Sequence, residues 1–380
     1  MREVLLLCWR DTRHPQGGGS ELYLERVGQE LARRGVTVTL RTAMYPGAAR
    51  AETVNGVRIS RGGGRFTVYP LALLAIVAAR FGRGPLRGIR PDAVIDTQNG
   101  IPFFARLVAG VPVTVLVHHC HREQWPVAGR LVARIGWFIE SRLSPWVHRD
   151  SQYLTVSLPS AEELGLLGVG PERVAVVRNG IDALEPGIDD VRSATPRIVV
   201  LSRLVPHKQI EDALFVLARL RHRVPDLHLD VIGSGWWDEE LYRHALRLGV
   251  LDRVTFHGHV TEQRKHRLLS RAWVHVMPSR KEGWGITVIE AAQHGVPTVG
   301  YVSSKGLTDS VVDGATGLLV RDLAGITEAV AGLLADQRLR AELGEKARQR
   351  AGEFSWEATA DGVGKVLASS VDGARIGGLV

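Results

Sequence analysis

The chain has little of what a disulfide-linked, metal-binding or membrane-spanning protein needs. Its 380 residues include two cysteines, Cys8 and Cys120, which lie in or beside apolar strand-like runs without a partner at metal-ligand spacing. We expect both to be buried free thiols in a reducing cytosol. The apolar run near the N-terminus is too short for a secretory signal, and the longest one, residues 66–79, is too short to span a bilayer. A cytoplasmic location is therefore expected.

Lysine is absent from the first 188 residues, and arginine gives this half of the chain most of the net charge of +8. A basic surface suits anionic lipid, nucleic acid or a phosphorylated acceptor. The arginines are scattered along the sequence and no nucleic-acid-binding module is recognisable. We therefore expect no nucleic-acid partner.

Two apolar segments of this basic half each have two interpretations. Residues 66–79 are followed by Arg80, Arg83, Arg87 and Arg90, and residues 127–147 carry an apolar stripe between arginines. Such a helix either packs against a sheet or lies on the inner face of an anionic membrane. We favour burial for both, because apolar stripes of this spacing most often face a core.

Length and alternation predict an α/β fold with two domains. A chain of 380 residues exceeds one hydrophobic core. Strand-like runs alternate with amphipathic helical stretches, stop in the polar segment 183–196, and restart at residue 197. We assign residues 1–188 to a first domain and 189–355 to a second, each a doubly wound Rossmann-like sheet. A last helix is expected over 356–372, followed by a loosely held end.

Glu282 and Glu290 bracket a predicted strand-to-helix turn in the second domain. Gly283 and Gly285 lie between them and let the backbone approach a ligand closely, while free amides at the helix start favour phosphate. Carboxylates accept charge-assisted hydrogen bonds from sugar and ribose hydroxyls. In an open α/β sheet these groups share the crevice at the strand ends, and a sugar nucleotide would suit their chemistry.

A second group of residues precedes this turn. Arg203 ends the strand that begins at residue 197, and Lys208 lies in the loop before the next helix. A planar guanidinium and a compact ammonium together suit a diphosphate. Gly233 and Gly235 follow the next strand in a tight turn. A single glycine pair is weak evidence, but these features at successive strand ends point to one binding site.

These motifs, with Gly17-Gly18-Gly19-Ser20, His118 and the segment His257-Gly258-His259-Val260, resemble the retaining nucleotide-sugar glycosyltransferases of family 4. The resemblance extends over nearly the whole chain. It implies a GT-B fold, in which two Rossmann-like domains face a central cleft and the C-terminal helix crosses back to the first domain. It also makes the first domain the acceptor domain and the second the donor domain.

The resemblance assigns roles to individual positions. Arg203 and Lys208 would bind the diphosphate, Glu282 the donor sugar and Glu290 the ribose hydroxyls, while His118 would lie near the reacting centre, with His119 as the alternative. Other donor contacts would come from Gly18, Gly19, Gly233, Gly235, His259, Gly285, Ile286 and Thr287. The acceptor would contact Gln98, Asn99, Arg122, Glu123 and Trp125.

Rival classes fit less well. A dinucleotide fingerprint would need its third glycine at Leu22, and the second strand ends in Arg41-Thr42 without the acid that holds a ribose. His118, His119 and His121 have a spacing that does not converge three imidazoles on zinc. A glycosidase would use paired carboxylates without a diphosphate clamp. No Asp-x-Asp pair occurs in the sequence, so no metal-dependent glycosyltransferase site is expected.

We therefore expect a metal-independent, retaining transferase that moves a hexose-type sugar from a nucleoside diphosphate to a hydroxyl acceptor. GDP- or UDP-linked donors are favoured, with ADP-linked sugars as an alternative, and no further cofactor is expected. Ser303, Ser304 and Lys305 replace the family's usual glycine-rich turn and leave the sugar open. The alternative is an inactive sugar-nucleotide-binding protein, and the chain is expected to be a monomer or homodimer.

Overall fold

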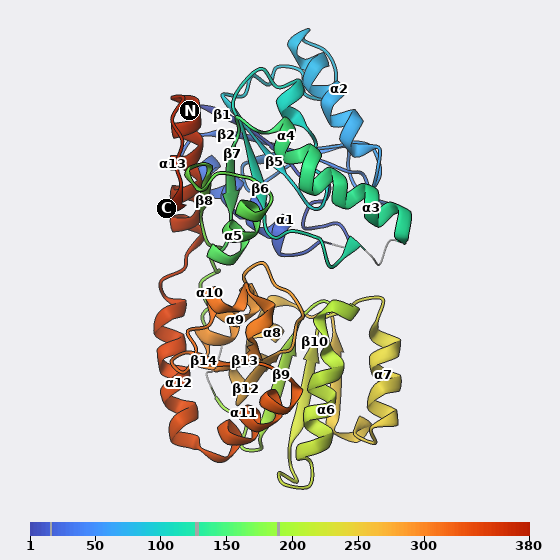
Figure 1. Cartoon of the computed structure of the whole chain (residues 1–380), viewed down its shortest axis with the longest axis vertical. Coiled ribbons are helices and arrows are strands. Elements are labelled where there is room, and N and C mark those ends of the chain that lie inside the picture. Colours follow the sequence, from blue (N-terminus) through green and yellow to red (C-terminus); the bar gives the residue numbers. More distant parts are fainter. Residues whose placement is uncertain (16, 126–128, 188–190) are drawn as a thin grey trace. The chain divides into compact units, whose positions relative to one another are not determined.

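The protein is described here by a computed structural model covering residues 1–15, 17–125, 129–187 and 191–380. The chain divides into two compact units (Figure 1). Unit 1 contains Met1–Gly180 and Trp356–Val380, and unit 2 contains Ile181–Ser355. The domain boundary predicted between 188 and 189 lies outside the described residues, and the units separate eight residues earlier than predicted.

Unit 1 is built around a sheet with the order β15-β8-β7-β6-β5-β1-β2-β4-β3, in which only β3 runs antiparallel to its neighbour. Its strands are β1 (Glu3–Leu7), β2 (Thr37–Thr42), β3 (Ala51–Val54), β4 (Val57–Arg61), β5 (Ala93–Thr97), β6 (Val113–Val117), β7 (Gln152–Thr155), β8 (Val174–Val176) and β15 (Gly378–Leu379). Its helices are α1 (Gly19–Arg33), α2 (Val68–Arg80), α3 (Arg130–Phe138), α4 (Ser144–Val147), α5 (Leu158–Leu166) and α13 (Trp356–Val371), with a π-helical segment, Ile139–Leu143, between α3 and α4.

The central strands β5 and β6 are buried along their whole length. This is the expected pattern for parallel strands covered by helices on both faces. The C-terminal helix α13 packs on α1 in unit 1, as predicted, and the hydroxyl of Thr359 donates to the carbonyl of Arg178. The chain end was predicted to be loose, but β15 pairs with β8 and adds an edge strand to the sheet.

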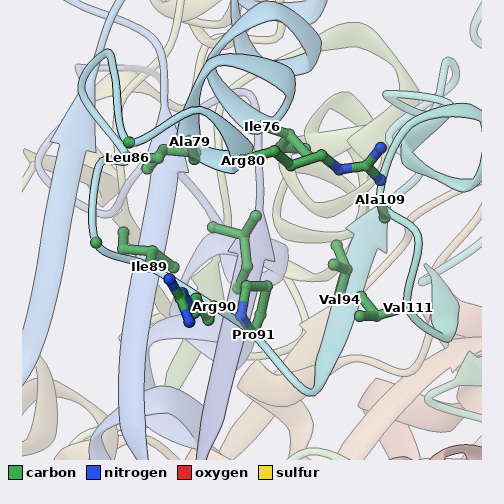
Figure 2. A pocket seen from close by; sticks show the side chains of 13 residues that line it. Ile76, Ala79, Arg80, Leu86, Ile89, Arg90, Pro91, Val94, Ala109 and Val111 are labelled. Carbon is green, nitrogen blue, oxygen red and sulfur yellow. The ribbon is translucent and has the colours of Figure 1, made fainter.

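A cavity of about 390 Å³ lies under α2 in unit 1. Figure 2 shows the residues that line it, with Ile76 and Arg80 of α2 on one side and Ile89 and Arg90 on the other. Arg90 directly precedes Pro91 and β5, so the cavity lies toward the amino-terminal end of that strand. Ligands of open parallel sheets bind at the opposite, carboxyl ends.

Unit 2 has a parallel six-stranded sheet with the order β11-β10-β9-β12-β13-β14. Its strands are β9 (Arg197–Leu201), β10 (His228–Ile232), β11 (Val254–Gly258), β12 (Val274–Met277), β13 (Thr298–Tyr301) and β14 (Gly317–Val320). Its helices are α6 (Ile210–Leu220), α7 (Asp238–Arg247), α8 (Glu262–Arg271), α9 (Ile286–Gln293), α10 (Leu307–Ser310), α11 (Leu323–Ala335) and α12 (Gln337–Ala351).

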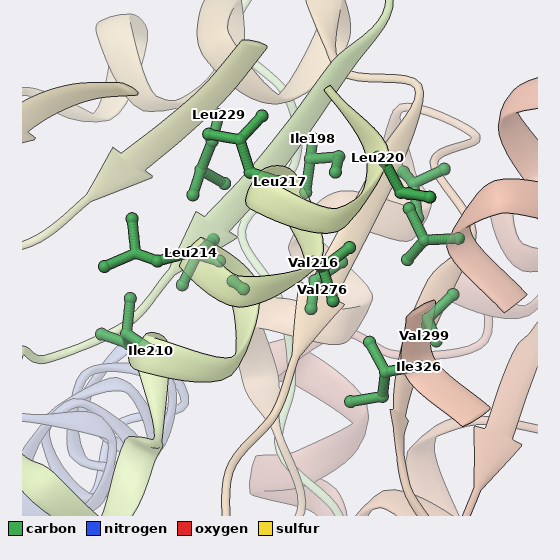
Figure 3. Close-up of a cluster of buried hydrophobic side chains, with 14 of the residues drawn as sticks. Ile198, Ile210, Leu214, Val216, Leu217, Leu220, Leu229, Val276, Val299 and Ile326 are labelled. Atoms are coloured by element: carbon green, nitrogen blue, oxygen red, sulfur yellow. The ribbon is translucent and has the colours of Figure 1, made fainter. Parts of the chain in front are cut away.

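The main core of unit 2 lies between this sheet and α6, with α7 and α11 beside it (Figure 3). Leu214 and Leu217 of α6 lie three positions apart on one helical face and are fully buried with Ile198 of β9. A smaller cluster, which includes Leu269 of α8 and Ala291 of α9, covers the other face. Both faces are therefore closed, and the strand ends remain as the place for polar side chains.

Candidate active site

The strand order of unit 2 reverses between β9 and β12, which are hydrogen-bonded neighbours. β9 leads to β10 on one side, and β12 leads to β13 on the other. In doubly wound sheets the loops at such a reversal diverge and leave a crevice at the carboxyl ends of the strands. The loop after β9 carries Arg203 and Lys208, and the loop after β12 carries Glu282.

Lys208 and Glu282 form an ion pair at this position, with Nζ and Oε1 2.5 Å apart. Their side chains are only 15% and 10% exposed, so the pair is largely removed from water. Arg203 lies on the same β9 loop and is exposed. The structure thus gathers two cations and one carboxylate of the predicted site at the carboxyl ends of β9 and β12.

The turn that holds Glu282 is fixed by its backbone. The amide of Glu282 donates to the carbonyl of Ser304, at 3.2 Å. A Cβ atom on Gly306 would lie 2.4 Å from the carbonyl oxygen of Glu282, so only glycine permits this approach. The segment around Lys305, which departs from the family pattern, therefore packs on the backbone of the Glu282 loop.

The start of α9 lies directly after this turn. Gly285 precedes the helix with a φ of +95°, a left-handed conformation that glycine adopts without strain. Trp284 is buried and its ring meets that of Phe354 edge-on, with centroids 4.9 Å apart. Ile286 and Thr287 form the first turn, where backbone amides lack helical partners. These amides are suited to a phosphate or a sugar hydroxyl.

Glu290 lies on α9 one turn further on and pairs with Lys265 of α8, with Oε1 and Nζ 2.5 Å apart. Burial raises the pKa of Glu290, and the nearby Lys265 opposes this only in part. Burial alone would lower the pKa of Lys265, but Glu290 and Glu262 outweigh it and raise that pKa. Lys265 is thus the cation that allows a buried carboxylate at this position.

Gly233 and Gly235 are explained mainly by the contact between two strand ends. A Cβ atom on Gly233 would lie 1.9 Å from the carbonyl oxygen of Ser202, and one on Gly235 would lie 2.0 Å from that of Leu204. Both glycines therefore let the β10 turn pack on the Arg203 loop. His259 follows β11 and is exposed, whereas His257 is held by Asp230, with Nε2 and Oδ1 2.8 Å apart.

The sheet of unit 1 reverses between β1 and β5. Gly18 precedes α1 in extended conformation, and its amide donates to the buried carboxylate of Glu21 at 2.8 Å. Glu21 also accepts from Ser20 Oγ at 2.9 Å and Arg10 Nε at 3.0 Å. Asn99, which follows β5, lies 3.4 Å from Ser20 Oγ. The loop formed by Gly17–Ser20 and Asn99 therefore lie together at the carboxyl ends of β1 and β5.

His118 follows β6 and is buried, with its ring edge-on to Tyr23 at 5.3 Å between centroids. Within the described residues, neither ring nitrogen has a hydrogen-bond partner. Burial lowers the pKa of His118 to about 4, so the imidazole is neutral near pH 7. The ring centroids of His119 and His121 lie 4.4 Å apart, whereas the ring of His118 lies against that of Tyr23.

The acceptor candidates divide into inward and outward groups. Gln98 is buried and accepts from Ser144 Oγ at 2.6 Å, and Trp125 donates from Nε1 to Glu140 at 2.7 Å. Arg122 and Glu123 are exposed in the loop that follows β6. Gln98 is therefore tied to α4, and Trp125 ties the loop after β6 to Glu140. Arg122, Glu123 and Asn99 are better placed to meet a ligand.

Sequence reasoning missed Lys265 and Glu21. Glu21 follows Gly18 by three residues, the spacing at which an acidic side chain caps the start of a helix, so the signal was present. Lys265 gave no comparable signal, because its approach to Glu290 depends on how α8 packs beside α9.

Two family models match successive parts of the chain. "Glycosyltransferase Family 4" matches residues 17–185, and "Glycosyl transferases group 1" matches residues 188–350. Together they cover most of both units.

Named relatives agree with these models. The chain is 31% identical over 304 residues to a glycogen synthase of Mycobacterium tuberculosis, covering 77% of this chain and 72% of that protein. It is 30% identical over 370 residues to a GDP-mannose-dependent alpha-(1-6)-phosphatidylinositol monomannoside mannosyltransferase of Mycolicibacterium smegmatis, covering 88% and 90%.

Solved structures share the fold. A sucrose-phosphate synthase from Thermosynechococcus elongatus superposes with a TM-score of 0.80 at 20% identity over 98% of this chain and all of that one. Anabaena Alr3699/HepE with UDP-glucose gives 0.74 at 17% identity over 97% and 100%. The chain therefore belongs to glycosyltransferase family 4 and is a nucleotide-sugar-dependent glycosyltransferase of the GT-B fold.

Proposed function

We propose that the protein transfers a hexose-type sugar from a nucleoside diphosphate to a hydroxyl acceptor, with retention at the anomeric carbon and without a metal ion. The observation that carries this proposal is the pair of carboxylate–lysine contacts, Lys208–Glu282 and Lys265–Glu290, on either side of the α9 start. A carboxylate on each side suits the hydroxyls of sugar and ribose, and the free amides of α9 and the cations of the β9 loop suit the diphosphate.

In the proposed reaction the bond between the anomeric carbon and the diphosphate oxygen breaks. Arg203 and Lys208 stabilise the negative charge that develops on the leaving diphosphate. The acceptor oxygen bonds to the anomeric carbon from the face that the diphosphate leaves, and its proton passes to a diphosphate oxygen. Glu282 holds the sugar and Glu290 holds the ribose. Gly18 and Gly19 contact the donor, and the neutral imidazole of His118 lies near the reacting centre.

The names of the relatives guide the choice of donor. One mannosyltransferase relative is GDP-mannose-dependent, and the HepE structure contains UDP-glucose. We propose a GDP- or UDP-linked hexose for this chain, with ADP-linked sugars as the alternative. Asn99, Arg122 and Glu123 are proposed to contact the acceptor, and the transfer is proposed to occur in the cytoplasm.

A panel of sugar nucleotides tests this proposal. The panel is screened first by thermal shift, since a ligand at 100 times its Kd stabilises a protein by about 2.7 kcal/mol. The donors that bind are then assayed for nucleoside diphosphate release with hydroxyl acceptors in EDTA. Binding should fall in Glu290→Gln but not in Glu262→Gln, whose side chain also pairs with Lys265 but is 67% exposed. Release that needs Mg²⁺ would contradict metal independence, and binding without release from any donor would favour the inactive alternative.

A further inference from the structure

The helix α3 exposes most of its apolar side chains. Leu131, Ile135 and Phe138 lie three or four positions apart along one helical face and are 71%, 52% and 59% exposed. Val132 beside them and Trp146 of α4 are exposed as well. We call this set, with Arg130, Arg134 and Arg142 between its members, the α3 surface. The sequence predicted that these apolar residues face a core, and this prediction was wrong.

The opposite side of α3 explains how the helix is held without them. Gly136 is the one buried residue of α3, and a Cβ atom there would lie 2.4 Å from the ring of Trp125. Trp125 donates to Glu140, whose other oxygen accepts the amide of His121 at 2.9 Å. The inner side is therefore fixed by one aromatic ring and one buried carboxylate, and the fold makes no use of the outer apolar side chains.

The exposed charges of the α3 surface are all positive. Between residues 129 and 149 the only carboxylate is Glu140, and it is fully buried. Arg130, Arg134 and Arg142 are all exposed. An exposed helix face made of large apolar side chains and arginine, without exposed acid, is typical of helices that lie in the interface of an anionic bilayer.

We propose that the α3 surface docks the protein on an anionic lipid bilayer. The apolar side chains enter the boundary between headgroups and acyl chains, and the three arginines contact lipid phosphates. A second copy of this chain is the less suitable occupant, because pairing two such surfaces would bring arginines of equal charge together. The proposed docking is peripheral. No helix within the described part of the chain is long and apolar enough to cross a membrane.

The position of α3 links this surface to the proposed reaction. Figure 1 shows α3 at the edge of unit 1, and its inner side contacts Trp125 in the loop that also carries Arg122 and Glu123. If the proposed sugar transfer is correct, a docked α3 would bring these acceptor candidates to the lipid surface, which favours a lipid-borne hydroxyl as acceptor. This last step rests on the proposed function, whereas the docking itself does not.

Another segment with exposed arginines and apolar residues is the obvious rival. α2 exposes Leu71 and Leu74 and precedes Arg83 and Arg87. However, four residues of α2 are buried in the core of unit 1, so its apolar content has a role in the fold. The outer apolar side chains of α3 have no such role in the core, and for this reason the proposal rests on α3.

Sedimentation of the full chain with large unilamellar vesicles tests the docking. We expect binding to phosphatidylcholine/phosphatidylglycerol vesicles at 0.1 M NaCl, little binding to pure phosphatidylcholine, and release as salt screens the charges. Arg130→Glu/Arg134→Glu should lower the partition coefficient at least tenfold, since each arginine near an anionic surface contributes about a fivefold factor. Ile135→Asp/Phe138→Asp should lower it about tenfold or more, because the apolar area no longer inserts.

Two matched controls carry the same kinds of change elsewhere. Leu166→Asp/Leu246→Asp alters exposed leucines of α5 and α7, and Arg83→Glu/Arg87→Glu alters the arginines after α2. Both should keep most of the binding. The melting temperature and sugar-nucleotide binding in solution are measured on every variant, so a failure of docking is distinguishable from a failure of the proposed function. If the aspartate variant of α3 unfolds, the arginine variant decides.

The proposal is overturned if the wild-type chain does not bind anionic vesicles. It is also overturned if the folded α3 variants bind as well as wild type, or if only the variant after α2 loses binding. A dimer that depends on Ile135 and Phe138 and binds no vesicles would show that a second copy covers the surface instead.

Discussion

Replacing Lys208 by methionine separates two roles that this side chain has in the account. In the structure it neutralises Glu282, and in the proposed reaction it stabilises the leaving diphosphate. Lys208→Met leaves a carboxylate that is 10% exposed without its cation. Breaking a buried ion pair in this way costs about 3 kcal/mol. For a unit of this size we expect the melting temperature to fall by about 6–12 °C.

The catalytic loss should be separate from this loss of stability. Removing one preorganised charge donor from a developing anion lowers kcat about 10²–10³-fold. If Lys208 binds the diphosphate, Lys208→Met should cost that much in the wild-type chain and again in a Glu282→Gln background. Glu282→Gln should recover most of the melting temperature, because no unpaired carboxylate remains. The assay is single-turnover release of nucleoside diphosphate, measured well below the melting temperature of each variant.

Lys346→Met serves as the matched control. Lys346 pairs with Glu342 on α12 of the same unit at 2.8 Å, but both side chains are about half exposed. Exposed pairs of this kind contribute about 0–1 kcal/mol, so neither stability nor turnover should change measurably. If Lys208→Met has no effect on turnover in the Glu282→Gln background, Lys208 acts only as the partner of Glu282 and does not bind the diphosphate.

Three further predictions concern Arg203, Gly233 and His118. Arg203→Ala should lower kcat about 10²–10³-fold. Because Arg203 is exposed, the melting temperature of this variant should stay within a few degrees of wild type. Unchanged turnover would show that Arg203 is not part of the site. Gly233→Ala should lower the free energy of unfolding in urea by about 3 kcal/mol or more, because the new Cβ is strained at a φ of +125° and clashes with the backbone. In the control Gly19→Ala the new Cβ meets nothing within 4 Å, so the free energy of unfolding should hardly change. Equal losses in the two variants would contradict the contact between the two strand ends. Burial lowers the pKa of His118 from 6.5 to about 4, so the unfolded chain binds a proton that the folded chain does not. Stability should therefore fall by about 3 kcal/mol as pH drops from about 6.5 toward 4, and His118→Asn should lack this part of the slope; identical profiles would show that His118 does not titrate in this way.

Much of the fold was predictable because strand periodicity and glycine-containing turns are local signals. The strand from residue 197, the turn at Gly233–Gly235 and the helix after Gly285 all follow from short segments of sequence. Their meeting at one sheet edge follows from the rule that parallel strands end on the same side. The two cations and the carboxylate near the reversal of strand order were therefore accessible to sequence reasoning.

What the sequence did not reveal depends on packing between distant segments. Lys265 reaches Glu290 because α8 lies beside α9, and no local pattern encodes that approach. Residues 131–138 have the apolar spacing of a buried helix, yet Trp125 occupies the inner side and the apolar side chains point outward. The strand Gly378–Leu379 is too short to be recognised before its partner β8 is known.

Hydrogen–deuterium exchange with bound nucleotide tests whether the donor binds at the carboxyl ends of β9 and β12 in unit 2. A nucleoside diphosphate or sugar nucleotide that raises the melting temperature is added at saturation to the full chain. We expect slower amide exchange in residues 202–208 and 283–290, because these segments carry the cations, the carboxylates and the free amides of α9. Protection confined to residues 66–94, around the cavity under α2, or absent from both unit 2 loops would contradict it.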